Sequence, residues 1–307
     1  TQWESFEKSS RHAVYVENGV IELMPISGPN LYSFKYVNGH PQNTKLNLLS
    51  VIAFGLLSLV ETGYPLMLAS MTVLTALRTA GISALASKYL AKPNSKILTI
   101  IGCGAQSEFQ VLAHDTLFEL SEVRYFDLDP KAMARFAEHL SSYSFKLTPG
   151  QNAKSLLSGS DIIITTTAAP GKHHILKLNQ LEPGQHIAGI GGDSPGKTEL
   201  DPEILKNSKL VIEYFPQTSH EGEIQNLGMD AQKYVYSELW EIISGKKPGR
   251  SNNEEITVFD AVGFALEDYS ILRLVYELAK KFNIGKDINL VPENLLDAKN
   301  LFGFLTD

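Results

Sequence analysis

The feature that most constrains the fold is a glycine turn between an apolar run and a helical pattern. Residues 96–102 (Lys-Ile-Leu-Thr-Ile-Ile-Gly) are mostly apolar, as expected for a strand buried on both faces of a parallel sheet. The turn Gly-Cys-Gly-Ala-Gln-Ser follows at 102–107, and a helix is predicted over 105–120. A buried strand that enters a helix through such a turn is typical of a dinucleotide-binding unit.

The two glycines of this turn have different tasks. Gly102 permits the tight turn, and Gly104 lets the backbone approach a pyrophosphate at the helix N-terminus. Ser107 occupies the third position, where the fingerprint has glycine, and this weakens the match. On the motif alone, an ordinary strand-turn-helix without a ligand remains the alternative.

An acidic residue lies near the end of the next predicted strand, 123–129. The carboxylate of Asp127 lies where it can accept hydrogen bonds from an adenosine ribose. Asp129 follows, and no basic residue occurs between Asp127 and Lys131. A 2′-phosphate would be repelled there, so the sequence favours NAD over NADP.

Strands and helices alternate through the middle of the chain. A helix is predicted at 130–141, and further strands at 161–167, 186–191, 210–214 and 255–260. This alternation predicts an α/β fold, a Rossmann doubly wound sheet.

The start of the chain is rich in strands instead. A hairpin is predicted at 13–16 and 20–24 around an Asn-Gly turn, with strands at 31–37, 48–59 and 66–69. Helices are predicted at 72–90 and 261–282, and the second returns the chain to this first region.

Composition limits the partners. The 307 residues suffice for two domains, and 43% hydrophobic with 20% charged residues is typical of a globular enzyme. The formal net charge is −7 without a Lys/Arg cluster, which disfavours nucleic acid and anionic membranes.

Glu61 and the Gly-Tyr-Pro at 63–65 interrupt the apolar stretches 46–60 and 62–77, so no membrane helix is predicted. The single cysteine, Cys103, excludes an internal disulfide and fits a reducing compartment, so we expect a cytoplasmic protein.

Two other chemistries are rejected. Residues 192–196 match the G-x-S-x-G nucleophile elbow, but the residue after Ser194 is Pro195, which has no N–H for the oxyanion hole. The eight histidines show no metal-binding spacing, so no metal site is predicted. Cys103 is more simply a small residue in the glycine turn than a reactive thiol.

Several stretches together resemble a known family. The chain is similar to the ornithine cyclodeaminase/μ-crystallin superfamily, and within it to the bacterial cyclodeaminases rather than the ketimine reductases or alanine dehydrogenases. The stretches that carry the resemblance are 35–41, 75–80, 102–110, 191–200, 221–225 and 259–265.

The resemblance implies two domains. Residues 1–92 and 262–307 would form a strand-rich substrate-binding and dimerisation domain from both chain ends, and 93–261 the Rossmann NAD-binding domain. A homodimer is implied. The family's first helical segment is absent and the chain starts without Met, so we expect the natural chain to begin upstream. Cys103 replaces the usual Asn and Ala261 the common Ser, which bears on cofactor affinity more than on the reaction.

The implied reaction is that of a cyclising ammonia-lyase. L-Ornithine becomes L-proline and ammonia, a step of arginine and ornithine metabolism and of proline biosynthesis. NAD takes a hydride from the α-carbon, the side-chain amine attacks the resulting imine, ammonia leaves, and the hydride returns. Holding the amine beside the imine favours ring closure through proximity.

The resemblance also assigns site residues. Arg11, Lys35 and Arg78 would clamp the substrate carboxylate, because Arg and Lys bind carboxylates well. Asp193 would be the base, with Glu22 as a partner for the amine or water. The remaining assigned contacts are Val262 for the substrate, and Ser50, Arg78, Gly102, Gly104, Ala105, Gln106, Asp127, Thr167, Lys197 and Ala261 for the cofactor.

The residues alone leave structural alternatives open. Lys35 also fits a solvated strand lysine, and Asp193 also fits simple turn chemistry. Ser50 and Thr167 also fit ordinary strand packing. Arg78 is different, because its predicted helix is otherwise free of charge before Lys88, which indicates a buried cation with an anionic partner.

The alternatives for function lie on the same scaffold. They are a lysine cyclodeaminase, a cyclic ketimine reductase, an amino-acid dehydrogenase, or a non-catalytic binding protein like μ-crystallin. The sequence does not distinguish ornithine from lysine or a cyclic ketimine, because the pocket around the distal amine is not readable from it.

Overall fold

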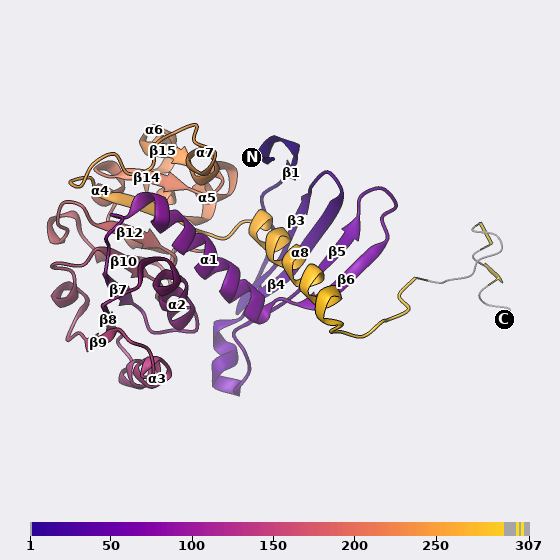
Figure 1. Ribbon diagram of the computed structural model, residues 1–307, viewed down its shortest axis with the longest axis horizontal. Coiled ribbons are helices and arrows are strands. Elements are labelled where there is room, and N and C mark those ends of the chain that lie inside the picture. Colours follow the sequence, from indigo (N-terminus) through magenta and orange to yellow (C-terminus); the bar gives the residue numbers. More distant parts are fainter. Residues whose placement is uncertain (1, 292–298, 301, 304–307) are drawn as a thin grey trace.

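The chain folds into two lobes joined by a long helix. The computed structural model describes residues 2–291, 299–300 and 302–303. One lobe contains an antiparallel sheet, and the other contains a parallel sheet (Figure 1). Helix α1 (Thr72–Leu90) runs from the first lobe into the second, where it packs on α2 and β16.

The antiparallel sheet has the order β1-β3-β4-β5-β6, with β2 also paired to β3. The predicted hairpin is confirmed, with Tyr15 opposite Val20 across β2 and β3. The strands are β1 (Glu7–Lys8), β2 (His12–Val16), β3 (Gly19–Ser27), β4 (Leu31–Gly39), β5 (Val51–Leu59) and β6 (Pro65–Ser70).

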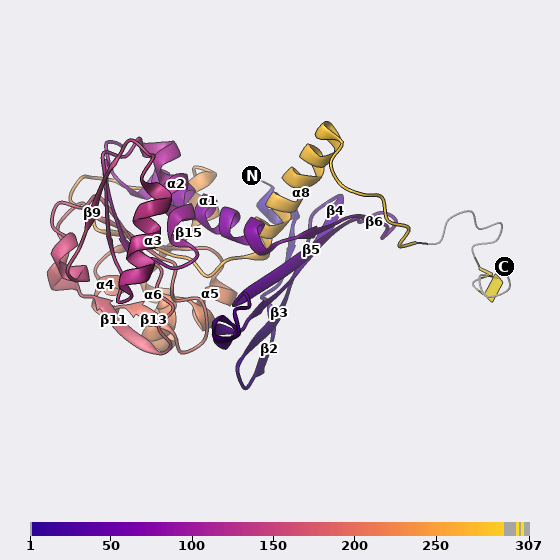
Figure 2. The same ribbon diagram turned by 90° about the horizontal axis from the view of Figure 1, so that it is seen from below.

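One face of this sheet is covered and the other is open. Alternate residues such as Met24, Val37 and Ala53 are buried with Leu272 of helix α8 (Ala265–Phe282) in one cluster. Figure 2 shows α8 standing on one side of the sheet only. The neighbouring residue Phe54 points to the opposite face and is exposed, as the two-residue period of a strand requires.

The second sheet is parallel and has the order β15-β14-β16-β12-β10-β7-β8-β9. From β7 the chain builds outward to β8 and β9, and then returns to β10 on the other side of β7, so the strand order reverses between β7 and β10. This confirms the doubly wound sheet. Its strands are β7 (Ile97–Ile101), β8 (Glu122–Phe126), β9 (Lys146–Pro149), β10 (Ile162–Thr165), β12 (His186–Gly189), β14 (Lys209–Ile212), β15 (Val235–Glu238) and β16 (Thr257–Asp260).

Helices cover this sheet and complete its two apolar cores. A small parallel ribbon of β11 (Lys172–Leu176) and β13 (Thr198–Leu200) lies beside it. The remaining helices are α2 (Ser107–Phe118), α3 (Pro130–Leu140), α4 (Pro202–Lys206), α5 (Phe215–Glu221), α6 (Ala231–Tyr234) and α7 (Leu239–Ile243), and the 3₁₀ turns are η1 (Trp3–Ser5), η2 (Pro41–Leu46), η3 (Ala153–Leu156), η4 (Leu178–Gln180) and η5 (Glu223–Asp230).

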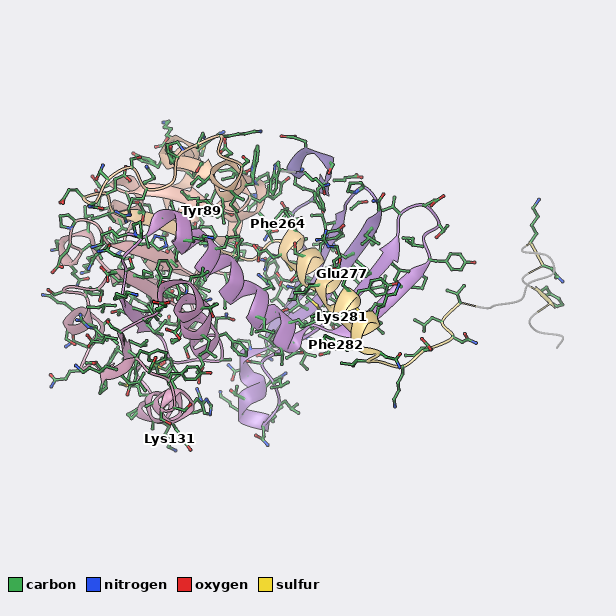
Figure 3. The ribbon with its side chains drawn as sticks, in the orientation of Figure 1. Tyr89, Lys131, Phe264, Glu277, Lys281 and Phe282 are labelled. Carbon is green, nitrogen blue, oxygen red and sulfur yellow. The ribbon has the colours of Figure 1, made fainter. Side chains whose placement is uncertain are left out.

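The return helix starts later than predicted. The pattern indicated a helix from residue 261, but α8 begins at Ala265, because residues 261–264 form a link in which Gly263 has φ +81°. Figure 3 shows Phe264 at this junction between the lobes. The N-terminal Trp3 packs there too, 6.0 Å from the Phe264 ring and stacked on Trp240 of α7 at 5.2 Å.

Within the described residues, no helix combines the length and apolar character needed to cross a bilayer.

Candidate active site

The glycine turn lies where the strand order of the parallel sheet reverses. Gly102 follows β7 and has φ +103°, and a Cβ there would lie 2.6 Å from the Thr166 carbonyl oxygen. Glycine is therefore required, since a side chain would separate the turn from the loop after β10. Ligands of doubly wound sheets bind at this reversal point.

The turn presents unpaired backbone donors. Within the described chain, the amides of Gly104, Ala105 and Gln106 donate to no protein acceptor, and a Cβ on Gly104 would meet open space. The Gln106 side chain donates to the Ala76 carbonyl of α1 at 3.0 Å, which fixes the turn against that helix. Free amides at the start of α2 fit the pyrophosphate of a dinucleotide.

Asp127 is fixed beside this turn. Its carboxylate accepts hydrogen bonds from the Cys103 amide at 2.7 Å and the Asp129 amide at 2.8 Å. Arg135 of α3 donates to the Cys103 carbonyl at 2.9 Å, a basic neighbour that sequence spacing did not reveal. Cys103 itself is fully buried, and burial, aided by Asp127, raises the pKa of its thiol to about 12, so it stays protonated at neutral pH.

The other predicted cofactor residues lie on several different loops, and they do not all contact the glycine turn. Thr167 lies on the loop after β10, and both its amide and its hydroxyl donate to the Glu199 carboxylate. The buried Ala261 follows β16 and donates to the Gly189 carbonyl at 3.1 Å. Ser50 precedes β5, and its carbonyl accepts from the His40 amide; no described contact links it to the glycine turn.

A buried ionic network lies at the junction of the lobes. Lys35 of β4 is only 1% exposed and donates to Asp268 of α8 at 3.0 Å. Arg78 of α1 donates to Glu267 at 2.7 Å, and its Nε lies 3.1 Å from Asp268. The solvated-lysine alternative for Lys35 is therefore wrong, and the buried Arg78 with an anionic partner is confirmed.

The environment shifts the pKa values of both cations. Burial, followed by repulsion from Arg78, lowers the pKa of Lys35 to about 8. Burial alone would also lower the pKa of Arg78, but Asp268 and Glu267 reverse this and raise it. Both side chains keep N–H groups without a protein partner: two on the Lys35 ammonium and the Nη2 pair of Arg78, within the described residues.

Arg11, between β1 and β2, reaches the same junction with its Nη donors already in use. Nη1 donates to both oxygens of Glu22, at 3.2 and 3.3 Å. Nη2 donates to the carbonyls of Val262 and Gly263 at 2.6 and 2.8 Å. Its Nε lies 3.0 Å from Glu221.

Glu213, directly after β14, binds the backbone of the link formed by residues 261–264. Its Oε2 accepts the amides of Val262 and Gly263 at 3.0 and 2.8 Å. Burial, with the nearby charge of Glu267, raises its pKa well above the usual range.

Four acidic residues of the network were not identified as site residues from the sequence. They are Glu213, Glu221, Glu267 and Asp268. Glu213 ends the apolar run Leu-Val-Ile of β14, so a charge at a buried strand end was the one available signal. Glu267 and Asp268 occupy the first turn of α8, where acidic residues are common for another reason, the helix dipole.

Asp193 stands apart from the buried network. It lies in the loop after β12, its side chain is 54% exposed, and its partner is Lys197 at 2.9 Å. Its electrostatic link to the network is through Glu221, whose pKa it raises. The structure thus brings Arg11, Glu22, Lys35, Arg78 and Val262 together, with Asp193 at their margin.

A surface depression of about 710 Å³ occurs elsewhere, at the starts of β14 and β15. Its charged groups are paired within the protein: Lys209 with Glu255, and Lys233 with Asp230. Both of its lysines are thus ion-paired near the surface, so the reversal point and the buried junction form the better candidate. Across the described ranges, no three His, Cys, Asp or Glu side chains gather as metal ligands.

The chain matches one known protein family over most of its length. A model of the ornithine cyclodeaminase/mu-crystallin family matches residues 1–283. The chain belongs to this family. The family resemblance inferred from the sequence is confirmed.

Individual relatives match this chain over most of its length. An ornithine cyclodeaminase of Agrobacterium fabrum is 46% identical over 304 residues, covering 99% of this chain and 85% of the relative. An archaeal alanine dehydrogenase dimer with bound NAD superposes with a TM-score of 0.89 at 35% identity, covering 94% and 90% of the two chains. A Δ¹-pyrroline-2-carboxylate reductase of Thermococcus litoralis, solved with NADH and L-proline, has a TM-score of 0.87 at 33% identity, covering 93% and 90%.

Proposed function

We propose that the protein is an NAD-dependent ornithine cyclodeaminase that converts L-ornithine to L-proline and ammonia. The observation that carries this proposal is the buried junction, where Lys35 and Arg78 retain free donors for a carboxylate while Glu22 and Glu221 offer negative charge for amines. The 46% identity to an ornithine cyclodeaminase over nearly the whole chain supports this substrate.

The residues around the glycine turn fit NAD. The amides of Gly104, Ala105 and Gln106 would hold the pyrophosphate, and Asp127 the adenosine ribose. We assign Gly102, Thr167, Lys197, Ser50 and Ala261 to the same site by their place in the family pattern. When bound, NAD would supply a reversible acceptor for the hydride of the substrate α-carbon.

Lys35 and Arg78 are assigned the substrate carboxylate. Two ammonium hydrogens of Lys35 and the planar Nη2 group of Arg78 are free to bind it. Asp268 touches both cations and sets their spacing. Arg11 contributes positive charge nearby, while its Nη donors fix Glu22 and the Val262 carbonyl at the substrate side.

Asp193 is assigned the base. An exposed carboxylate beside the junction can take the proton of the α-ammonium and pass it to water, which frees the nitrogen lone pair needed for imine formation. Lys197, 2.9 Å away, holds the carboxylate in place. Glu22 is the assigned partner of a substrate amine or water.

At the level of the whole chain, we assign substrate binding and dimerisation to residues 1–92 and 262–307, and NAD binding to 93–261. The open face of the antiparallel sheet supports a homodimer, because Leu23 and Phe54 are exposed there with Tyr36 between them. The reducing environment suggested by the lone, buried Cys103 supports a cytoplasmic location.

The test is an assay of the purified protein with L-ornithine and a catalytic amount of NAD⁺. Proline and ammonia should appear in equal amounts without accumulating NADH. Stoichiometric NADH would instead indicate an amino-acid dehydrogenase. Inactivity with ornithine but turnover of L-lysine or a cyclic ketimine would move the protein to those activities, and no turnover of any of them would favour a binding protein.

A further inference from the structure

One buried carboxylate of the junction has no hydrogen bond. Glu221, the last residue of α5, is 5% exposed, and neither of its carboxylate oxygens accepts a hydrogen bond from the described residues. Arg11 Nε lies 3.0 Å from its Oε2, but both atoms lack a properly aligned hydrogen bond. A buried carboxylate left in this state requires an explanation.

Glu22 is the other carboxylate that contacts the Arg11 side chain, and it differs from Glu221 in the hydrogen bonds that it accepts. Both oxygens of Glu22 accept hydrogen bonds from Arg11 Nη1, at 3.2 and 3.3 Å. Each oxygen of Glu22 thus already accepts one hydrogen bond from the protein, whereas neither oxygen of Glu221 accepts one from the described residues. Glu221 retains its full capacity to accept hydrogen bonds, so a ligand that donates them would bind at Glu221 first.

The charges around Glu221 favour a cation. The groups that face it are Arg11, Glu22 of β3, Asp193 after β12 and Tyr15 of β2. Three carboxylates against the Arg11 guanidinium and the Lys197 ammonium, which pairs with Asp193, still leave an excess of negative charge. Burial raises the pKa of Glu221 to about 7, Arg11 opposes the rise, and Glu22 and Asp193 add to it. A carboxyl group with a pKa near neutrality suits proton transfer.

We propose that Glu221 is a further catalytic residue, which binds the ammonium at the far end of the diamino-acid substrate and takes its proton. This assignment rests on the proposed function. The substrate carboxylate would lie at Lys35 and Arg78, and its other end at the unsatisfied carboxylate beside Arg11. A protonated nitrogen has no lone pair, so this proton must leave before the nitrogen can close the ring.

The step balances without a further reactant. One N–H bond of the distal ammonium breaks, and an O–H bond forms on Glu221. The neutral amine then forms the N–C bond of the ring and passes one of its two protons to the other nitrogen on that carbon. The bond from the carbon to this departing nitrogen breaks, and the lone pair of the ring nitrogen forms the C=N bond of the cyclic imine. Glu221 returns its proton to the departing ammonia, which leaves as ammonium, so the carboxylate is regenerated.

The test compares Glu221→Gln with the matched variant Glu203→Gln on the exposed face of α4. Glutamine keeps the size of the side chain and an oxygen near Arg11, but it cannot take a proton. At pH 7 we expect kcat/KM for L-ornithine to fall at least about 100-fold in Glu221→Gln and to stay unchanged in Glu203→Gln. Inhibition by L-proline, which lacks the distal ammonium, should change less than about threefold in both.

The pH profile separates proton transfer from a structural role. In Glu221→Gln, kcat/KM should keep rising about tenfold per pH unit up to pH 9, because only substrate already deprotonated in solution can then react. The wild-type profile should level off above about pH 7. Glu221→Asp should recover part of the lost rate.

Different results separate the two proposals. An active wild type and a Glu221→Gln variant with the same pH profile would overturn the role of Glu221 alone. Equal loss of proline and ornithine binding would also overturn it, in favour of a role in holding Arg11. A wild type that makes no proline would overturn the proposed function and this assignment with it.

Discussion

At the scale of single residues, the site depends on charges paired across long sequence distances. Lys35 meets Asp268, and Arg78 meets both Asp268 and Glu267. The sequence indicated that Arg78 needs an anion, because its helix is otherwise free of charge up to Lys88. It did not indicate which anion, since pairing between β4, α1 and α8 is fixed only by the packing of the lobes.

The first prediction concerns Asp268, which faces two buried cations. Asp268→Asn should lower the free energy of unfolding by about 3–5 kcal/mol, because Lys35 and Arg78 are left partly uncompensated. Urea unfolding measures this. In contrast, Asp230→Asn removes an exposed ion pair to Lys233 and should leave the urea midpoint unchanged. Equal midpoints for both variants would show that the buried network contributes nothing to stability.

The second prediction concerns Asp193. Asp193→Asn should bind NAD as the wild type does but lose turnover, because it is the only carboxylate in its loop and asparagine cannot accept the proton. NAD binding followed by fluorescence and proline formation measure the two properties. Proline formation at a near-normal rate would show that the base is another residue.

At the scale of elements, the buried strands of the parallel sheet were predictable and its edge strands were not. β7, β10 and β12 are short apolar runs, whose period and composition identify them. β9 and β15 form the two edges of the parallel sheet and contain Lys146, Pro149 and Glu238, the polar and proline content that edge strands use against aggregation. Their pattern therefore resembles a loop.

The third prediction uses the two glycines of the turn between β7 and α2. Gly102→Ala should lower the melting temperature, because its Cβ would lie 2.6 Å from the Thr166 carbonyl and its φ is positive. Gly104→Ala should keep the melting temperature, since its Cβ meets open space, but weaken NAD binding. A Gly104→Ala variant with unchanged NAD affinity would place the pyrophosphate elsewhere.

The fourth prediction concerns the contact between β16 and η5. Asp260 is fully buried, and burial raises its pKa to about 7, although the amides of Glu223 and Ile224 oppose this. The folded protein therefore retains this proton up to about pH 7, whereas the unfolded chain releases it near about pH 4. Between these values the folded state binds more protons, so this group's contribution to stability falls as pH rises.

Asp260→Asn removes that titration. Urea unfolding should show that the variant's loss of unfolding free energy relative to the wild type is smaller at pH 8 than at pH 5. The reason is that at pH 8 only the wild type buries a charge at this position. A difference between the two proteins that is constant with pH would show that Asp260 titrates in its ordinary range.

At the scale of the whole molecule, the division into a strand-rich lobe and a doubly wound lobe follows from the order of the predicted elements. The helix at 72–90 was assigned to the first lobe, yet the end of α1 contributes Ala86 and Leu90 to a core of the second lobe. The sequence does not reveal that this helix packs in both lobes, because the residues on both of its packing faces are apolar or small.

The fifth prediction concerns assembly. Phe54→Glu puts a charge on the open face of the antiparallel sheet, and it should convert a dimer to a monomer in size-exclusion chromatography with light scattering. Met229→Glu, on an even more exposed apolar residue of η5 in the other lobe, should leave the dimer intact. A Phe54→Glu protein that remains dimeric would place the interface on another surface.

The most direct test of a cyclodeaminase reaction follows the hydrogen on the substrate α-carbon. The purified protein should convert L-ornithine deuterated at that carbon into L-proline that still carries the deuterium, with one ammonia per proline and no net NADH. Such retention is expected when the hydride is removed and returned within one turnover, because a hydride held on NAD does not exchange with water. Proline without deuterium, or NADH formed in amounts equal to the ornithine consumed, would contradict the proposed function.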